Sequence, residues 1–239
     1  MGGALAENWE RYWQDLSAEP GSAVWDTEDS AHAGAALPLI EEHRRAGLPV
    51  LDLGCGNGTQ TVQLTATHER VIGLDLSPTA IARARERHAG SGVDFRVLDL
   101  LDGPAVAALH AELGDATAYS RGLLHQIPGE HKLTAARAIA TLVGATGRAY
   151  VLELSPATTQ ALGAALATGE AAVPKMKDVL RHGITPAAWP GGGLPELLAA
   201  AGLAVLAEGE TTMRTTDTLA DGSPLLLPMT WAVLRRAEP

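Results

Sequence analysis

The sequence predicts an α/β fold whose central sheet is doubly wound and mainly parallel. Three observations lead to this prediction. Short apolar runs alternate with segments of helical periodicity from residue 50 onward, a glycine-rich loop follows the first apolar run, and acidic residues end the next two runs. Because parallel strands need crossover connections, the repeated strand–helix order places helices on both faces of the sheet. The 239 residues, of which 46% are hydrophobic, suffice for one such domain with an added lobe.

The composition limits the partners that we expect. Lys and Arg number 18 and Asp and Glu 28, so the net charge of −10 argues against a large nucleic-acid interface. No apolar run reaches the length of a membrane span, and the start of the chain lacks a secretory signal pattern. The single cysteine, Cys55, allows no intrachain disulfide and fits a reducing compartment. We therefore expect a cytoplasmic protein with a small-molecule substrate and no nucleic-acid or membrane partner, and keep a homodimer as an option.

Residues 1–36 form an aromatic arm before the first strand. One apolar face recurs there at helical spacing. Its members are Trp9, Tyr12, Trp13 and Leu16. Trp25 follows outside that face, and a second helix is predicted over about residues 30–45. Two interpretations stay open: the aromatic face packs the arm onto the domain, or the arm is a lid over a ligand.

The stretch from Val50 to Thr61 organises the chain. Val50–Leu53 is an apolar run typical of a buried parallel strand, and glycines follow at positions 54, 56 and 58. A helix is predicted to start within 59–64, which would offer unpaired N–H groups to an anionic ligand group. The glycine spacing fits neither the dinucleotide fingerprint nor the phosphate loop, which disfavours a nicotinamide dehydrogenase.

The segment D-L-G-C-G-x-G, residues 52–58, resembles motif I of class I S-adenosylmethionine (SAM)-dependent methyltransferases over all seven positions of the pattern, six of which specify a residue. The resemblance implies a Rossmann-like sheet of seven strands with an antiparallel last strand, and an N-terminal segment that closes the site. It implies SAM as the cofactor, S-adenosylhomocysteine (SAH) as its product, and cofactor binding by the loop. The residues so implied are Asp52, Gly54, Cys55, Gly56, Asn57, Gly58 and Thr59.

The second and third predicted strands end in acidic residues. Asp75 closes the run 70–75, and a carboxylate there can accept hydrogen bonds from both ribose hydroxyls; its neighbour Leu76 joins the expected cofactor site. Asp99 follows the run 93–98. In the resembled family an acidic residue at this place accepts from the adenine amino group.

The residue after it, Leu100, offers its backbone N–H to an adenine ring nitrogen in the resembled family. Asp94 is a competitor for the adenine contact, but it lies at the wrong end of its strand. Asp102 is a second competitor that is also suited to cap the helix that follows. We prefer Asp99.

A fourth strand is predicted over 115–120, and the segment after it resembles the "vLHH"-type segment of small-molecule methyltransferases, with Gln126 in place of the second His. His125 is our candidate general base, because its reference pKa lies near neutrality; packing or ordering of the loop is the competing role. Ser120 is included in the cofactor site, and Tyr119 and Arg121 are candidates for orienting an acidic or carbonyl-bearing substrate. We find no cluster with metal-ligand spacing and expect no metal.

The segment 155–193 interrupts the strand–helix order after a fifth strand at 148–154, and we interpret it as a substrate-side insert. It carries a basic cluster, which either holds an anionic substrate or is a solvated face. The cluster comprises Lys175, Lys177, Arg181 and His182. Trp189 near its end is included among the candidate substrate contacts. Strands at 203–208 and 226–235, separated by a turn at 215–223, are expected to close the sheet.

These segments give four predicted units: the arm or lid 1–36, the SAM-binding core 37–154, the insert 155–193, and the remainder of the core sheet, 194–239. The predicted reaction is methyl transfer to a small molecule by in-line displacement, with oxygen or nitrogen favoured as acceptor, and natural-product tailoring as the expected setting. The candidate substrate contacts are Trp13, Trp25, Tyr119, Arg121, His125 and Trp189. The alternatives are a regulatory SAM-binding protein and a cyclisation catalyst of the same fold.

Overall fold

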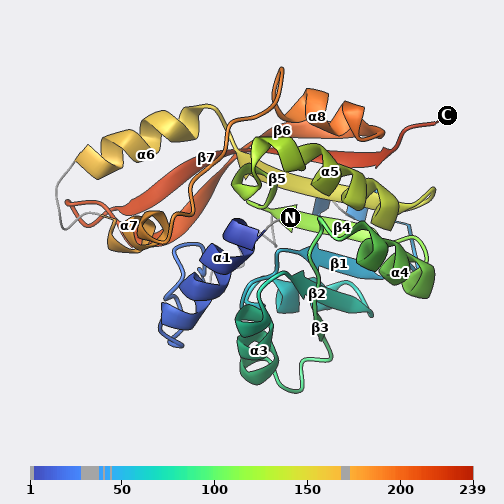
Figure 1. The fold of residues 1–239 in the computed structure, drawn as a ribbon, viewed down its shortest axis with the longest axis horizontal. Coiled ribbons are helices and arrows are strands. Elements are labelled where there is room, and N and C mark those ends of the chain that lie inside the picture. Colours follow the sequence, from blue (N-terminus) through green and yellow to red (C-terminus); the bar gives the residue numbers. More distant parts are fainter. Residues whose placement is uncertain (1–2, 28–37, 40, 44, 168–172, 239) are drawn as a thin grey trace.

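The computed structural model describes residues 3–27, 38–39, 41–43, 45–167 and 173–238. Its centre is a seven-stranded sheet of order β3-β2-β1-β4-β5-β7-β6 (Figure 1). The first five strands are parallel, and β7 runs antiparallel to both β5 and β6, which confirms the predicted fold class. The strands are β1 Val50–Leu53, β2 Val71–Asp75, β3 Asp94–Val97, β4 Thr117–Arg121, β5 Arg148–Leu154, β6 Leu203–Thr218 and β7 Pro224–Arg236.

Helices connect the parallel strands and cover the sheet. Asp102 accepts a hydrogen bond from Ala105 N and so caps α4, the role that competed with adenine binding. Ser77 likewise caps α3, with Pro78 at its first position. The α-helices are α1 Gly3–Asp15, α3 Pro78–Arg87, α4 Gly103–Leu113, α5 Gly129–Val143, α6 Ala157–Ala167, α7 Pro174–Arg181 and α8 Leu194–Ala200, and the 3₁₀ helices are η1 Thr61–Ala66 and η2 Leu124–Gln126.

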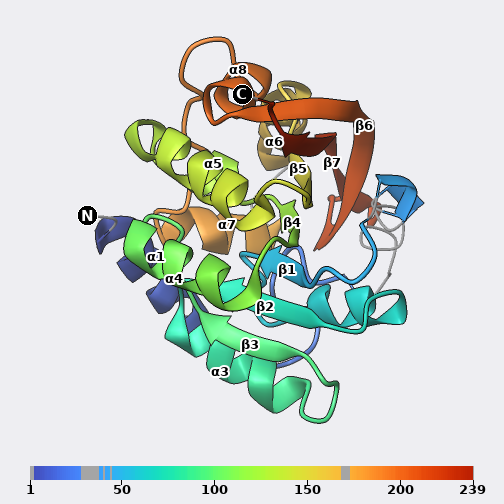
Figure 2. The same ribbon diagram turned by 90° about the vertical axis from the view of Figure 1, so that its right-hand side faces the viewer.

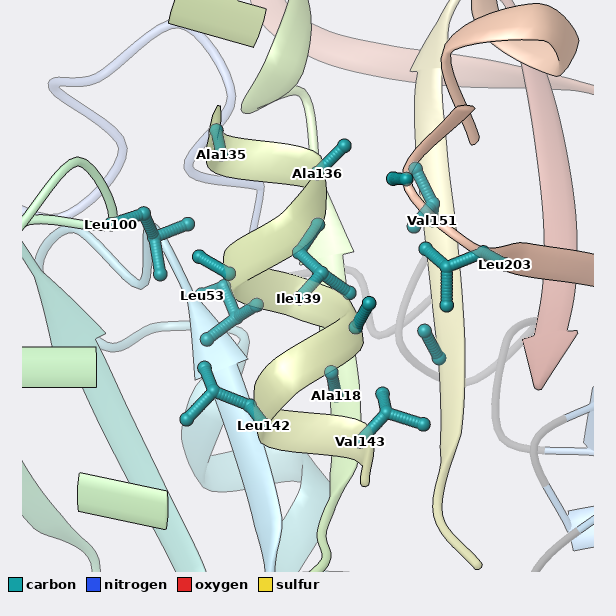
Figure 3. Close-up of a cluster of buried hydrophobic side chains, with 14 of the residues drawn as sticks. Leu53, Leu100, Ala118, Ala135, Ala136, Ile139, Leu142, Val143, Val151 and Leu203 are labelled. Carbon is teal, nitrogen blue, oxygen red and sulfur yellow. The ribbon is translucent and has the colours of Figure 1, made fainter. Parts of the chain in front are cut away.

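The largest apolar cluster lies between α5 and the sheet. One face of α5, predicted from its helical spacing, points at the strands (Figure 3). Ile139 and Val143 are fully buried there. The side chains around them include Leu53, Leu100, Ala118, Val151 and Leu203. This packing fixes β1 and β4 at the centre of the sheet.

The segment after the glycine loop differs from the prediction. It forms the short 3₁₀ helix η1 from Thr61, where we expected a helix beginning within 59–64. Its β-branched residues lower helix propensity, and the Thr65 hydroxyl donates to the Val62 carbonyl at 2.6 Å in competition with the backbone ladder. A regular α-helix N-terminus therefore does not face the loop, and that part of the anion-binding argument is corrected.

The closing hairpin is longer than predicted. β6 continues to Thr218 and β7 begins at Pro224, so the first four residues of the expected turn at 215–223 are strand and the turn is confined to 219–223. The outer half of β6 is polar on its exposed face, which hides a strand from a search for apolar runs. β3 and the hairpin lie at opposite ends of the sheet (Figure 2). The extended half of the hairpin contacts α6 and α7 of the predicted insert.

The aromatic arm docks on α3. Glu10 on α1 accepts hydrogen bonds from Ser77 Oγ at 2.6 Å and Thr79 Oγ1 at 2.5 Å, so it adds to the cap of α3. Arg83 in turn donates to the Leu16 carbonyl at 2.7 Å, just beyond the end of α1. Most of the helix predicted over 30–45 lies outside the described residues, although 38–39 and 41–43 are helical. Among the described residues no helix is long and apolar enough to cross a membrane.

Candidate active site

A cavity opens at the carboxyl ends of the central strands, where β1 is flanked by β2 and β4. Ligands of open α/β sheets bind at this kind of switch point. Four carboxylates line one side, which we call the acidic half: Asp26, Asp52, Asp75 and Asp99. Apolar side chains line the other side, which we call the apolar half. They come from the end of β5, the α6–α7 region and the hairpin, and are Leu154, Leu162, Met176, Val179, Leu180, Ile184, Met213 and Leu227.

The glycine loop contributes Gly54 and Gly56 to the cavity lining. Gly54, Gly56 and Gly58 have φ values of +75°, +55° and +80°, which side-chain-bearing residues rarely adopt. A Cβ at Gly56 would lie 2.8 Å from the ring of Trp13. The arm therefore covers the loop so closely that position 56 has no room for a side chain.

Asp75 ends β2 at the acidic half. Its two oxygens accept from the backbone N–H groups of Gly56 and Ser77, each at 2.9 Å, so it ties the glycine loop to the start of α3. Burial raises the pKa of Asp75, and these two hydrogen bonds oppose that shift. Asp99 accepts from Leu101 N at 2.8 Å and lines the same half.

Asp52 is buried at the end of β1, where its carboxylate accepts from Thr61 Oγ1 at 2.6 Å. Desolvation raises the pKa of Asp52 to about 6, although the Thr61 hydrogen bond and the charge of Arg121 lower it. Burial also raises the pKa of the Cys55 thiol, which fits an unreactive wall residue. Asp26 joins the arm to the loop, since its Oδ2 accepts from Asn57 Nδ2 at 2.9 Å.

His125 lies in η2 and is part of a buried network that the sequence analysis missed. Its Nδ1 lies 2.7 Å from Glu153 Oε2, and Glu153 is fully buried. The same carboxylate accepts from the backbone N–H groups of Leu123, Leu124 and His125 at 2.7–3.1 Å. Glu153 therefore fixes both the loop and the imidazole. The available signal was an acidic residue near the carboxyl end of the fifth strand.

The other ring nitrogen of His125 faces Gln126. Its Nε2 lies 2.7 Å from Gln126 Nε2, and both residues line the cavity. With the amide in this orientation, Gln126 donates and Nε2 accepts, so Nδ1 carries the proton that it donates to Glu153. The network thus holds an imidazole whose accepting nitrogen is Nε2, in a residue that lines the cavity.

Comparisons with known proteins agree with this architecture. Residues 50–147 match the family described as "Methyltransferase domain". A solved structure of a SAM-dependent methyltransferase from Anabaena variabilis ATCC 29413 is 30% identical, with a TM-score of 0.87, and the alignment covers 97% of this chain and 94% of that chain. The protein belongs to the SAM-dependent methyltransferase family.

Curated members of the SAM-dependent methyltransferase family match shorter stretches. The 27-O-demethylrifamycin SV methyltransferase of Amycolatopsis mediterranei is 36% identical over 88 residues, which are 36% of this chain and 30% of that protein. The juvenile hormone acid O-methyltransferase of Bombyx mori is 32% identical over 129 residues, 50% of this chain and 45% of that protein. The matched stretches thus span less than half the length of these two relatives.

The residues of the acidic half fit the cofactor of this methyltransferase family, SAM. Carboxylates suit the hydroxyl and amino groups of a nucleoside and an amino acid, because an ionised carboxylate is purely an acceptor. Between Asp75 and Asp99 the wall is apolar, as a flat purine requires. It consists of Leu76, Leu98, Leu100 and Leu101.

The structure brings most of the predicted site residues of this methyltransferase to one cavity, and it leaves three out. Gly58 packs under Phe95, Ser120 is buried beside the core, and Trp189 lies 4.5 Å from the ammonium of Lys132, outside the cavity lining. Gly58 keeps an evident role in the loop turn. Trp189 instead packs against the largest apolar cluster.

The basic cluster of the methyltransferase also lies outside the cavity lining. Lys175 donates to the Gly21 carbonyl at 2.7 Å, and Arg181 pairs with Asp178 at 2.9 Å. The ring of His182 lies between Asp178 and Asp15 of the arm. The contacts of Lys175 and His182 join α7 to the arm, whereas the Arg181 pair lies within α7. Among the described residues there is no group of side chains suited to hold a metal ion.

Proposed function

We propose that this protein transfers the methyl group of SAM to a small-molecule acceptor by in-line displacement. The observation that supports the proposal is that the acidic half and the apolar half line one continuous cavity, with His125 and Arg121 among the lining residues. A cofactor in the acidic half would therefore face an acceptor in the apolar half without a wall between them. Positioning of this kind supplies much of the rate of a displacement reaction.

In this proposal the acidic half binds the cofactor. The glycine loop and Asp52 take the methionine end, Asp75 the ribose hydroxyls, and Asp99 with the N–H of Leu100 the adenine. When bound, the cofactor supplies an electrophilic methyl group on a sulfonium. The buried position of Asp52 is suited to a cationic amino group, since a counter-charge favours the ionised carboxylate.

His125 is proposed as the general base for an oxygen or nitrogen acceptor. Glu153 holds its Nδ1–H, which orients the ring and stabilises the imidazolium that forms when Nε2 takes a proton. The Gln126 amide donates to Nε2, so we infer that an acceptor hydroxyl or amine displaces this amide. The buried Oε1 of Gln126 has no hydrogen-bond partner among the described residues, which favours a side chain that reorients when an acceptor binds.

The arm is proposed to close the site. Trp25 contacts Trp9 and Tyr12 at ring-centroid distances of 5.5 and 5.6 Å, and Trp9, Trp13 and Trp25 all line the cavity. In this proposal the arm has both of the roles that the sequence left open, because Tyr12 is buried in the packing and the tryptophans would cover a bound ligand.

The names of the curated relatives support the small-molecule acceptor. One acts on a demethylated rifamycin and the other on juvenile hormone acid, and the latter is named an O-methyltransferase. We therefore favour oxygen over nitrogen as the acceptor atom. The rifamycin relative is also consistent with natural-product tailoring.

Incubation of the protein with SAM and a panel of small metabolites tests the proposal. We expect mass spectrometry to detect one metabolite that gains a methyl group, with an equal amount of SAH released. Heat-inactivated protein is the control. Cofactor that binds tightly but is never consumed, across acids, phenols, alcohols and amines, would contradict methyl transfer and favour a binding protein or a cyclisation catalyst.

A further inference from the structure

One guanidinium lines the boundary of the apolar half. Arg121 ends β4, and it is the one Arg or Lys side chain among the described residues that line the cavity. The apolar half offers this guanidinium few hydrogen-bond acceptors. Thr158 is a polar member of that wall, and its hydroxyl is already bonded to the Pro228 carbonyl. A cation at the edge of an apolar chamber is costly unless a partner compensates it.

The described residues leave most of the hydrogen-bonding capacity of Arg121 unused. Nη1 and Nη2 each lie 3.4 Å from the Trp25 carbonyl, and Nη1 lies 3.7 Å from Met213 Sδ. No carboxylate among the described residues lies within ion-pair distance of it. A guanidinium has five N–H donors in a planar fork, so one distant carbonyl and one thioether satisfy only part of it.

Asp52 is one candidate for an internal counter-ion, because the charge of Arg121 lowers the pKa of Asp52. Its carboxylate accepts a hydrogen bond from Thr61 Oγ1, however, and forms no ion pair with Arg121. Tyr119, two residues earlier on the same face of β4, is buried, and its hydroxyl has no partner among the described residues. A second polar group near Arg121 is therefore also unsatisfied.

We propose that Arg121 binds an oxyanion on the methyl acceptor, so that the acceptor is a predominantly apolar molecule with one carboxylate. The inference rests on the proposed function, because it assigns the apolar half to the acceptor. A carboxylate matches the guanidinium fork in two parallel hydrogen bonds. The chamber beyond it, with Leu162, Met176, Val179 and Met213, takes the apolar body. Trp25, whose carbonyl faces the guanidinium and which lines the same cavity, would help to exclude water from the ion pair.

Binding of matched acids and alcohols to the SAH complex tests this assignment. The probes are decanoate, naphthoate and phenylpropanoate, each paired with the primary alcohol of the same skeleton. Trp9, Trp13 and Trp25 line the cavity and report binding through their fluorescence. We expect at least one acid to bind the wild-type complex about tenfold more tightly than its alcohol, because hydrogen bonds to charged groups are the stronger ones.

Arg121→Gln should remove that preference while leaving SAH affinity unchanged. Arg121→Lys should keep part of the preference, since the charge remains and the fork is lost. Arg137→Gln is the matched control, because Arg137 is exposed on α5 and outside the cavity lining, and it should behave as wild type. An acid preference that survives in Arg121→Gln, or no acid preference in any pair, would overturn the inference.

A loss of SAH affinity in Arg121→Gln would also overturn the inference, because Arg121 would then hold the cofactor. The proposed function fails in a different way. If the wild-type protein does not bind SAH, the cofactor-site assignment is wrong, and if it binds SAM but never consumes it, methyl transfer is wrong. SAH binding with methyl transfer but without an acid preference contradicts only the role of Arg121.

Discussion

In the acidic half of the cavity, hydrogen bonds from nearby groups hold each of three carboxylates, whereas the apolar half is held by packing between distant segments. Asp52 is fixed by Thr61, Asp75 by two backbone N–H groups, and Asp99 by Leu101 N. The apolar half brings the arm, the α6–α7 region and the β6–β7 hairpin together through aliphatic and aromatic contacts. The hydrogen-bonded acidic half suits a ligand that is the same in every reaction. The packed apolar half suits a chamber whose shape depends on a few side chains.

The largest effect that would distinguish the roles of the two halves is expected from a substitution of His125, which lines the cavity that they share. His125→Ala should lower turnover at least about a hundredfold if the imidazole removes a proton, while SAH affinity stays within about threefold. Steady-state kinetics on an acceptor from the metabolite panel and calorimetry with SAH measure the two quantities. Glu153→Gln should also lower turnover, since the ring loses its charged partner.

His131→Ala is the matched control for this variant. His131 lies half-buried in the first turn of α5, outside the cavity lining, and its loss should leave turnover unchanged. If His125→Ala lowers turnover and SAH affinity by the same factor, or lowers neither, His125 has a packing role.

Gly56→Val should abolish the acidic half as a binding site. Valine resists the positive φ of +55°, and its first side-chain carbon would collide with Trp13 at 2.8 Å. We expect SAH affinity to fall about a hundredfold or more, measured by calorimetry. Gly90→Val is the control, because Gly90 has a φ of +86° and no atom near its missing Cβ. A Gly56→Val protein that stays folded and binds SAH as wild type would refute the loop assignment, and Gly56→Ala provides a milder second variant.

Asp75→Ala should weaken SAM and SAH by the same factor, about thirtyfold, because the ribose is common to both. The substitution also removes the acceptor for the Gly56 and Ser77 N–H groups, so circular dichroism must show that the fold persists. Asp94→Ala tests the specificity of the effect, since Asp94 is exposed at the opposite end of β3 and should not affect affinity. Unequal losses for SAM and SAH would place Asp75 away from the ribose.

The two halves also differ in how far the sequence predicts them. The glycine loop, Asp75 and Asp99 lie at strand ends, and strand ends follow from apolar runs that are short and local. The contacts of Arg121 with Trp25 and of His125 with Glu153 join residues 96 and 28 positions apart, and no local pattern specifies such contacts. Trp189 is a predicted substrate contact, but long-range packing places its ring under the ammonium of Lys132 and outside the cavity lining. The polar face of β6 hid the strand that carries Met213.

The smallest expected effect is a pH dependence of stability that arises from Asp52. This residue belongs to the acidic half, and the charge of Arg121, at the boundary of the apolar half, lowers its pKa. The folded pKa of Asp52, about 6, lies above the ordinary aspartate value of 3.8, so the folded state binds more protons between these values. Its contribution to stability is therefore present at low pH and is lost as pH rises through about 6. Asp52→Asn should remove this dependence from thermal unfolding curves, with Asp94→Asn as the control.

If ionised Asp52 pairs with the cationic amino group of the cofactor, the wild-type affinity for SAH should rise at most about tenfold across the same pH range, and the affinity of Asp52→Asn should not rise. Parallel affinity curves for the two proteins would place the amino group elsewhere.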